Sequence, residues 1–157
     1  MENTATTDTA TLHQVFVVRT LDARRERVWA AWTEPERFAR WFGTPPFSTP
    51  ASRVAMDARP GGRWSAVQVS SEDGTELPFM GSYIEVVPPE RLVMTFDDAE
   101  NPDDPNGELT ALMLRDVGGR TEMTLHQKGH LPAEQYPLLA KGYGLFFEQL
   151  AKYLAEG

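Results

Sequence analysis

The sequence of 157 residues contains no cysteine. This absence excludes a disulfide framework, metal sites built from thiolates and a cysteine nucleophile. It is typical of proteins that work in a reducing compartment, so we expect a cytoplasmic protein. The sequence also lacks any run approaching the roughly eighteen uninterrupted apolar residues that a membrane span needs. We therefore expect a soluble protein with no membrane span.

Basic residues are scarce relative to acidic ones. The sequence has 15 lysines and arginines against 23 aspartates and glutamates, which gives a formal net charge of -8. A charge of this sign repels phosphate backbones and anionic lipid surfaces. We therefore expect no nucleic acid partner.

The beginning of the chain carries neither the basic start nor the apolar run that a secretory signal requires. It is rich in threonine and alanine, and we interpret residues 1–12 as a flexible N-terminal tail. The remaining length is that of one domain, and 41% hydrophobic content is enough for one sizeable core. The sequence thus predicts a single domain over residues 13–157.

Short runs rich in β-branched and aromatic residues alternate with turn signals made of glycine, proline and asparagine. The predicted strands are 15–21, 53–58, 63–70, 77–87, 91–96, 108–115 and 121–128. Short turns between consecutive strands indicate an antiparallel meander. The sequence therefore predicts one curved antiparallel sheet of seven strands.

Two short helices are predicted between the first strand and a proline-rich loop. Trp29 and Trp32 share one face of the first helix, and Phe42 lies on the inward stripe of the second. Thr33 and Glu36 have the spacing of a capping box, in which each side chain accepts a hydrogen bond from the other residue's backbone amide. We expect this box to begin the second helix.

From Leu138 onward the apolar period changes to 3.6 residues, which predicts a long C-terminal helix. It is the only predicted element long enough to cover a sheet of seven strands. The fold class is therefore α+β, with the long helix over the concave face of the sheet. Gly142 and Gly144 inside this helix cost about 1 kcal/mol each relative to alanine, which indicates a close approach of the sheet or a ligand there.

Several ordered motifs resemble those of one protein family. They are 19–23 (RTLDA), 28–36 (VWAAWTEPE), 40–42 (RWF), 60–64 (PGGRW), 85–92 (EVVPPERL) and 142–143 (GY). Together they resemble the family named for the C-terminal domain of the heat-shock protein 90 ATPase activator, within the START-like, birch-pollen-allergen-like SRPBCC superfamily. The resemblance covers about residues 14–155. It implies a helix-grip fold with a hydrophobic pocket between the sheet and the C-terminal helix.

The resemblance does not imply one reaction. Members of the superfamily bind lipids, hormones or polyketides, and some are cyclases or hydrolases. This sequence departs from the family pattern at three positions. Arg24 stands where proline is usual, Tyr143 stands where tryptophan usually follows glycine, and Gln127 stands where a histidine is expected near the end of the last strand. The third departure argues against an acid/base role at that position.

Thirteen side chains face inward by helical or strand periodicity and are predicted to line a ligand pocket. They are Trp41, Phe42, Trp64, Gln68, Phe79, Tyr83, Met94, Phe96, Leu112, Gln127, Tyr143, Phe146 and Phe147. Aromatic side chains in such positions also suit a filled core, so a pocket and a packed interior both stay open.

Glu85 is the one candidate catalytic residue. A carboxyl group in an apolar cavity has a raised pKa, which general acid or base catalysis requires. The opposing interpretation is a surface or ion-paired glutamate, which is the commoner role of this residue in a strand.

The sequence gives no indication of a metal or cofactor. His13, His126 and His130 fall in the tail, on the wet face of a strand and in a turn, so they are not expected to converge. The acidic stretch 97–108 lacks the ligand spacing of a calcium loop, and its prolines indicate a stiff solvated loop. Neither a nucleophile elbow nor a phosphate-binding or dinucleotide-binding glycine motif is present.

Three functions follow from these observations. The first is binding of a small hydrophobic or amphipathic ligand in an internal cavity between the sheet and the C-terminal helix. The second is a cyclase-like or hydrolase-like enzyme that uses the same cavity, with Glu85 or a tyrosine hydroxyl moving protons. The third is a protein-interaction module of the chaperone-activator type, with a protein as partner. The sequence carries no signal for the oligomeric state.

Overall fold

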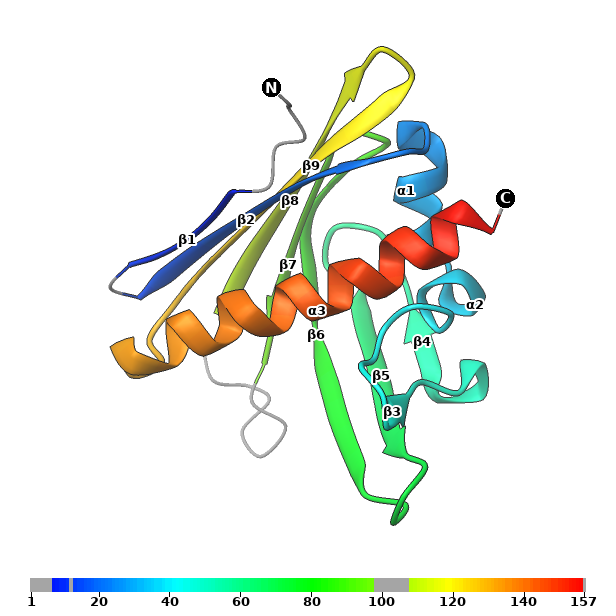
Figure 1. The fold of residues 1–157 in the computed structure, drawn as a ribbon, viewed down its shortest axis with the longest axis vertical. Coiled ribbons are helices and arrows are strands. Elements are labelled where there is room, and N and C mark those ends of the chain that lie inside the picture. Colours follow the sequence, from blue (N-terminus) through cyan, green and yellow to red (C-terminus); the bar gives the residue numbers. More distant parts are fainter. Residues whose placement is uncertain (1–6, 12, 98–107, 157) are drawn as a thin grey trace.

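A computed structural model describes residues 7–11, 13–97 and 108–156 of the chain. Figure 1 shows a curled sheet with one long helix across its concave face. The strands are β1 (Thr7–Thr11), β2 (Gln14–Leu21), β3 (Phe47–Ser48), β4 (Val54–Met56), β5 (Arg63–Ser70), β6 (Glu76–Val87), β7 (Arg91–Phe96), β8 (Glu108–Val117) and β9 (Arg120–Lys128). The helices are α1 (Arg25–Thr33), α2 (Pro35–Phe38) and α3 (Tyr136–Ala155), with short 3-10 turns at Ala51–Arg53 and Ala133–Gln135.

All strand pairs in the described part of the chain are antiparallel and form one sheet of nine strands. The order is β1-β2-β9-β8-β7-β6-β5-β3, and β4 also pairs with β5. The predicted strands correspond to β2 and to β4 through β9. The α+β helix-grip prediction is therefore confirmed.

β1 lies within the range that the sequence analysis assigned to a tail. It pairs antiparallel with β2, from Thr7 opposite Val18 to Thr11 opposite Gln14. The segment TDTAT has no apolar alternation, so the pattern that predicts strands gave no signal here. Its place in the sheet rests on backbone hydrogen bonding to the neighbouring strand, which sequence periodicity does not report.

The two short helices are present, but the predicted capping box is wrong. The hydroxyl of Thr33 donates to the carbonyl oxygen of Trp29 at 2.8 Å, and neither α1 nor α2 has a side-chain cap. Thr33 is the last residue of α1, so its hydroxyl reaches the carbonyl four residues back within the same helix. Pro35 in the first turn of α2 begins that helix instead.

The C-terminal half of α3 covers a packed aromatic core. Trp41 lies 5.0 Å from Trp32 and 6.5 Å from Phe147 between ring centroids, and its indole nitrogen donates to the carbonyl of Ala31 at 2.8 Å. Aromatic contacts of this kind are worth about 0.5–1.5 kcal/mol each beyond the area that they bury. The helices α1 and α2 thus fill this end of the space between α3 and the sheet. Within the described residues, no helix is long and apolar enough to cross a membrane.

β6 changes partner halfway along its length. Residues 76–82 pair with β5, and residues 83–87 pair with β7, with a register shift within the second stretch between Tyr83 and Glu85. An irregularity of this kind bends a strand and increases its twist. The bend curls the sheet around α3.

Gly81 sits where β6 leaves one partner for the other. The indole nitrogen of Trp64, on β5, donates to the backbone carbonyl of Thr95, on β7, at 3.0 Å. A β-carbon at Gly81 would lie 1.7 Å from that carbonyl oxygen and 2.6 Å from the indole nitrogen. The absence of a side chain at Gly81 therefore allows three strands to be joined across the bend.

Candidate ligand cavity

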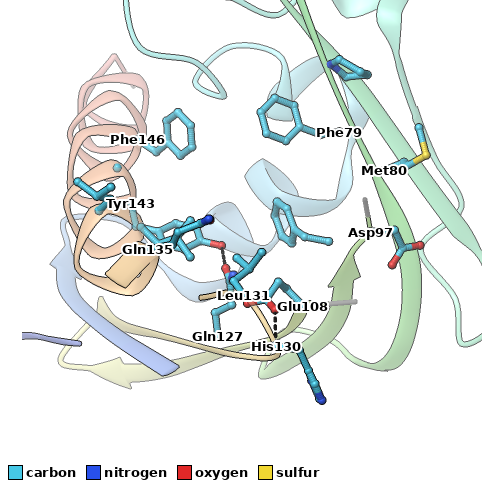
Figure 2. Close-up of a pocket in the computed structure, with 15 residues that line it drawn as sticks. Phe79, Met80, Asp97, Glu108, Gln127, His130, Leu131, Gln135, Tyr143 and Phe146 are labelled. Carbon is cyan, nitrogen blue, oxygen red and sulfur yellow. Dashed lines mark hydrogen bonds between the residues drawn. The ribbon is translucent and has the colours of Figure 1, made fainter. Parts of the chain in front are cut away.

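A cavity of about 1070 Å³ lies between the N-terminal half of α3 and the sheet. This volume is close to the upper end of the range of about 300–1,000 Å³ that is typical of small-molecule sites. Figure 2 shows the side chains around it. They are Pro78, Phe79, Met80, Phe96, Asp97, Glu108, Gln127, His130, Leu131, Gln135, Leu138, Leu139, Gly142, Tyr143 and Phe146.

Gly142 opens space on the face of α3 that borders the cavity. A β-carbon at this position would meet no atom within 4 Å outside its own stretch of helix. The sheet therefore does not approach Gly142 closely, because this glycine faces a gap, and the alternative of a ligand at this position stays a prediction. The helix bears the conformational cost of a glycine here without a packing contact in return.

One part of the cavity wall is aromatic. Phe79 and Phe146 lie on the same side of the cavity in Figure 2, and both pack on the buried Phe42, at centroid distances of 5.1 and 5.3 Å. Phe96 contributes a further ring and lies 4.9 Å from Trp64. These rings are anchored on the core behind them, so they present a preformed apolar surface.

The opposite part of the wall contains a buried carboxylate. Glu108 begins β8 and is 7% exposed. Its Oε1 accepts from the side-chain nitrogen of Gln127 at 3.0 Å and from the hydroxyl of Tyr136 at 2.8 Å, and its Oε2 accepts from the backbone amide of His130 at 2.9 Å. Buried polar groups need such partners, and here every partner of Glu108 is a donor.

The direction of each hydrogen bond in this group is fixed by a second bond behind it. The backbone amide of Leu131 donates to the Tyr136 oxygen at 3.3 Å, so the hydroxyl hydrogen of Tyr136 is free for Glu108. The hydroxyl of Tyr143 donates to Oε1 of Gln127, so the amide nitrogen of Gln127 faces Glu108. A network from α3, β9 and the turn before α3 thus converges on one carboxylate.

Gly129 makes room for this carboxylate. A β-carbon at Gly129 would lie 1.7 Å from Oε2 of Glu108. Any other residue at the end of β9 would displace the carboxylate from its donors. The glycine, like the network, is therefore part of how the chain places a charge beside the cavity.

Three buried tyrosines have raised pKa values. Burial raises the pKa of Tyr136 to about 12, with the hydrogen bond to Glu108 as the second cause. Burial also raises the pKa of Tyr83 and of Tyr143. At neutral pH these hydroxyl groups are protonated, so Tyr136 and Tyr143 act as donors in the network.

We expect the protein to lose stability as the pH rises from about 10 to about 12, because the unfolded chain releases its phenolic protons near 10 while the folded chain holds that of Tyr136. The unfolded state then binds fewer protons, so the free energy of unfolding falls with pH. Denaturant unfolding at a series of pH values, with tyrosinate absorbance as a second signal, measures this. A Tyr136→Phe variant whose alkaline titration overlays that of the original chain contradicts the assignment.

Five of the thirteen residues predicted to line a pocket lie in the wall of this cavity. They are Phe79, Phe96, Gln127, Tyr143 and Phe146. The structure places the other eight in the packed interior instead, and each of them is at most 3% exposed. These are Trp41, Phe42, Trp64, Gln68, Tyr83, Met94, Leu112 and Phe147. Inward-facing residues thus divide between a filled end and a hollow end of the same space.

Glu85 lies outside the cavity. Its carboxylate accepts a hydrogen bond from Arg91, and its side chain is 46% exposed. This is the ion-paired surface arrangement that the sequence analysis named as the alternative. The geometry therefore gives no support to proton transfer by Glu85 on a ligand in the cavity.

Sequence reasoning missed Glu108 and Tyr136. Glu108 and Asp97 end the acidic stretch that was interpreted as a solvated loop, yet both line the cavity, and the Asp97 side chain is only 8% exposed. Residues 98–107, the rest of that stretch, lie outside the described residues. Two signals were present: Glu108 shares the inward face of β8 with Leu112, and Tyr136 precedes Tyr143 by seven residues on α3.

The three histidines make contacts with different partners and share no common site. The ring of His13 bonds the carbonyl of Leu131, and the ring of His126 stacks on Phe16 and bonds Gln14, while His130 contributes its backbone amide to Glu108. In the part of the chain that the structure describes, no three metal-ligating side chains form a group able to hold an ion.

Comparison with known proteins identifies relatives of the whole fold. The family model described as activator of Hsp90 ATPase homolog 1-like protein matches residues 22–155. Protein NE0264 from Nitrosomonas europaea is 26% identical with a TM-score of 0.77, over 94% of this chain and 97% of that one. Protein CV1439 from Chromobacterium violaceum is 29% identical with a TM-score of 0.74, over 90% and 96%.

The AHSA1-like protein from Aeromonas hydrophila has the same fold at a lower sequence identity. It is 20% identical with a TM-score of 0.72, over 90% of this chain and 92% of that one. None of the curated proteins matches the sequence significantly.

Proposed function

The chain belongs to the family of activator of Hsp90 ATPase homolog 1-like proteins. We propose that it binds a small apolar or amphipathic molecule in the cavity under α3. Its fold is that of a superfamily whose members commonly bind hydrophobic ligands. The fold alone does not select a function, so the proposal rests on the cavity itself.

The observation that carries the proposal is a cavity with an aromatic side and a single hydrogen-bonded polar corner. Phe79, Phe96 and Phe146 offer the apolar surface, and Glu108 with its network lies beyond them. A mostly apolar site with a few convergent polar groups is the usual form of a small-molecule site. The apolar side supplies affinity through burial, and the polar corner orients the ligand.

The proposed place of action is the cytoplasm, since the chain has no cysteine to oxidise. The proposed role is binding rather than conversion. Glu85, the residue named for proton transfer, is paired with Arg91 at the surface. Support for the binding role thus comes from the cavity, and it needs no reactive group.

Fluorescence of N-phenyl-1-naphthylamine, a neutral apolar dye, tests this function directly. We expect the dye to bind the purified full chain with one site and to be displaced by apolar metabolites. A displacing compound at a hundredfold excess over its Kd should stabilise the folded state by about 2.7 kcal/mol in thermal unfolding, because it binds only that state. A chain that neither binds the dye nor responds to any compound contradicts the proposal.

Two aromatic truncations separate cavity binding from adsorption to the surface. Phe146→Ala removes a ring from the cavity wall and should weaken dye binding by about tenfold. Phe16→Ala removes an equal ring that is 36% exposed and stacks on His126 outside the cavity, so dye affinity should not change. Equal losses in the two variants would place the dye outside the cavity.

A further inference from the structure

We propose that the cavity selects its ligand by charge: it accepts an amphipathic molecule whose polar end is a protonated amine, and it rejects the anionic counterpart, such as a fatty acid. This inference rests on the proposed ligand-binding function and names the chemical class of the ligand. The charges around the cavity, the direction of the hydrogen bonds and the aromatic wall each support it.

The ionisable side chains of the described cavity wall are two carboxyls, Asp97 and Glu108, together with His130 and Tyr143. Glu108 and Asp97 both line the cavity, and neither lysine nor arginine is among its lining residues. Asp97 forms an ion pair with Arg63 at 3.7 Å, whereas Glu108 has three hydrogen-bond donors and no ion pair among the described residues. The ranges 1–6, 12, 98–107 and 157 contain no lysine or arginine in their sequence either.

Glu108 is a buried carboxylate with no cationic partner among the described residues, and such a group is costly to the stability of a fold. Charged groups are rarely buried unless they are paired, because leaving water costs several kcal/mol per ion. The three donors on Glu108 offset part of that cost, and a cationic ligand would offset the remainder. An uncompensated carboxylate beside an apolar cavity is therefore the complement of an amine joined to an apolar body.

Hydrogen-bond geometry leads to the same ligand. A carboxylate offers about four lone-pair positions, and the described residues occupy three of those on Glu108. Oε1 accepts twice, from Gln127 and Tyr136, whereas Oε2 accepts only once, from the amide of His130. Glu108 can thus accept one more hydrogen, which a ligand ammonium group can donate.

The network also offers nothing to an anionic head group. The hydrogens of Tyr136 and Gln127 are directed at Glu108, and that of Tyr143 is directed at Gln127. A ligand carboxylate near Glu108 would face a like charge and would find these donors already engaged. Like charges placed together across an interface cost several kcal/mol, which is enough to exclude a fatty acid head from this corner.

Aromatic rings on the remaining wall favour the same charge. Phe79, Phe96 and Phe146 present ring surfaces, whose faces carry partial negative charge. A cation within about 6 Å of a ring face is attracted to it, and more strongly where water is excluded. The aromatic wall therefore accepts both the apolar chain and the ammonium group of one molecule.

Three ligands with the same alkyl chain test the inference on the unmodified full chain. Decylamine, decanol and decanoate are titrated against bound N-phenyl-1-naphthylamine at about pH 7, below the concentration at which each forms micelles, since at that pH the amine is a cation and the acid an anion. We expect decylamine to displace the dye at a concentration about tenfold or more below that of decanoate, with decanol between them.

A pair of variants assigns the preference to Glu108. Glu108→Gln removes the cavity charge and should bring the affinities for decylamine and decanoate to within about twofold of each other. Glu122→Gln removes one equal charge from an ion pair with Arg115 at the surface, so the full preference should remain. Thermal unfolding of each variant establishes that it is folded before its affinities are compared.

The outcomes distinguish this inference from the proposed function. A preference for decylamine that is lost only in Glu108→Gln supports the inference. Equal affinities, or a preference for decanoate, in the unmodified chain overturn it while leaving a binding cavity, and this comparison stands even if Glu108→Gln does not fold. Failure of the dye and of all three ligands to bind overturns the proposed function and the inference with it.

Discussion

Replacing Gly81 with alanine is expected to lower the free energy of unfolding by about 3 kcal/mol or more, because the new methyl group has no space. Its β-carbon would lie 1.7 Å from the carbonyl oxygen of Thr95, which is backbone and cannot rotate away. The strand would have to move and would lose the hydrogen bond from the Trp64 indole to that carbonyl. The loss therefore combines overpacking with an unsatisfied buried donor.

Urea unfolding at equilibrium measures this effect, and the chain offers a matched control. Gly142→Ala adds the same methyl group where no atom outside its own stretch of helix lies within 4 Å, on a helix in which alanine is favoured over glycine. That variant should gain about 0.5–1 kcal/mol. A Gly81→Ala variant as stable as the original chain would mean that β5, β6 and β7 are not joined as described.

Replacing Gly142 with tryptophan is expected to weaken dye binding by about a hundredfold, which corresponds to about 2.7 kcal/mol. The side chain would begin at the cavity face of α3, where it can occupy the volume that a ligand would use. Because it enters open space, the helix and the aromatic core beneath its other half should keep their packing. Dye titration and thermal unfolding, run on the same sample, separate a filled cavity from an unfolded chain.

Gly142→Ala is the control for this variant as well, since its small side chain should leave the dye affinity within about twofold of the original. Unchanged dye affinity in the folded Gly142→Trp variant would move the ligand site away from α3. Loss of binding together with loss of the cooperative transition would instead assign the effect to misfolding. The pair thus tests the position of the site apart from the stability of the fold.

The sheet and the long helix could be predicted from the sequence because each has a local signature. Alternation with period two gave the inward faces of the strands, and the 3.6-residue period gave α3. The sequence did not indicate whether an inward-facing side chain would be buried in the core or would line the cavity. Trp64 on β5 and Phe79 on β6 both point inward, yet one is sealed in the core and the other lines a cavity.

The difference between those two residues arises from tertiary placement. α1 and the turn after α2 bring Trp32 and Trp41 against Phe147 in one half of α3, and no comparable element fills the other half among the described residues. Periodicity cannot state which half is filled. Composition misled in the same way at Glu108, where an acidic neighbourhood indicated solvent although the strand register with Leu112 pointed inward.

The two edges of the sheet bear on how the protein behaves at high concentration. One edge is β1, of five residues, and the other consists of β3 and β4, of two and three residues. An exposed long apolar strand is a template on which further copies can assemble into aggregates, and short edge strands limit this. Because β1 pairs with β2, the strand β2 with its buried Val15 and Val17 does not lie at the edge of the sheet. The segment without a recognisable strand pattern thereby protects the chain against self-association through its most apolar edge.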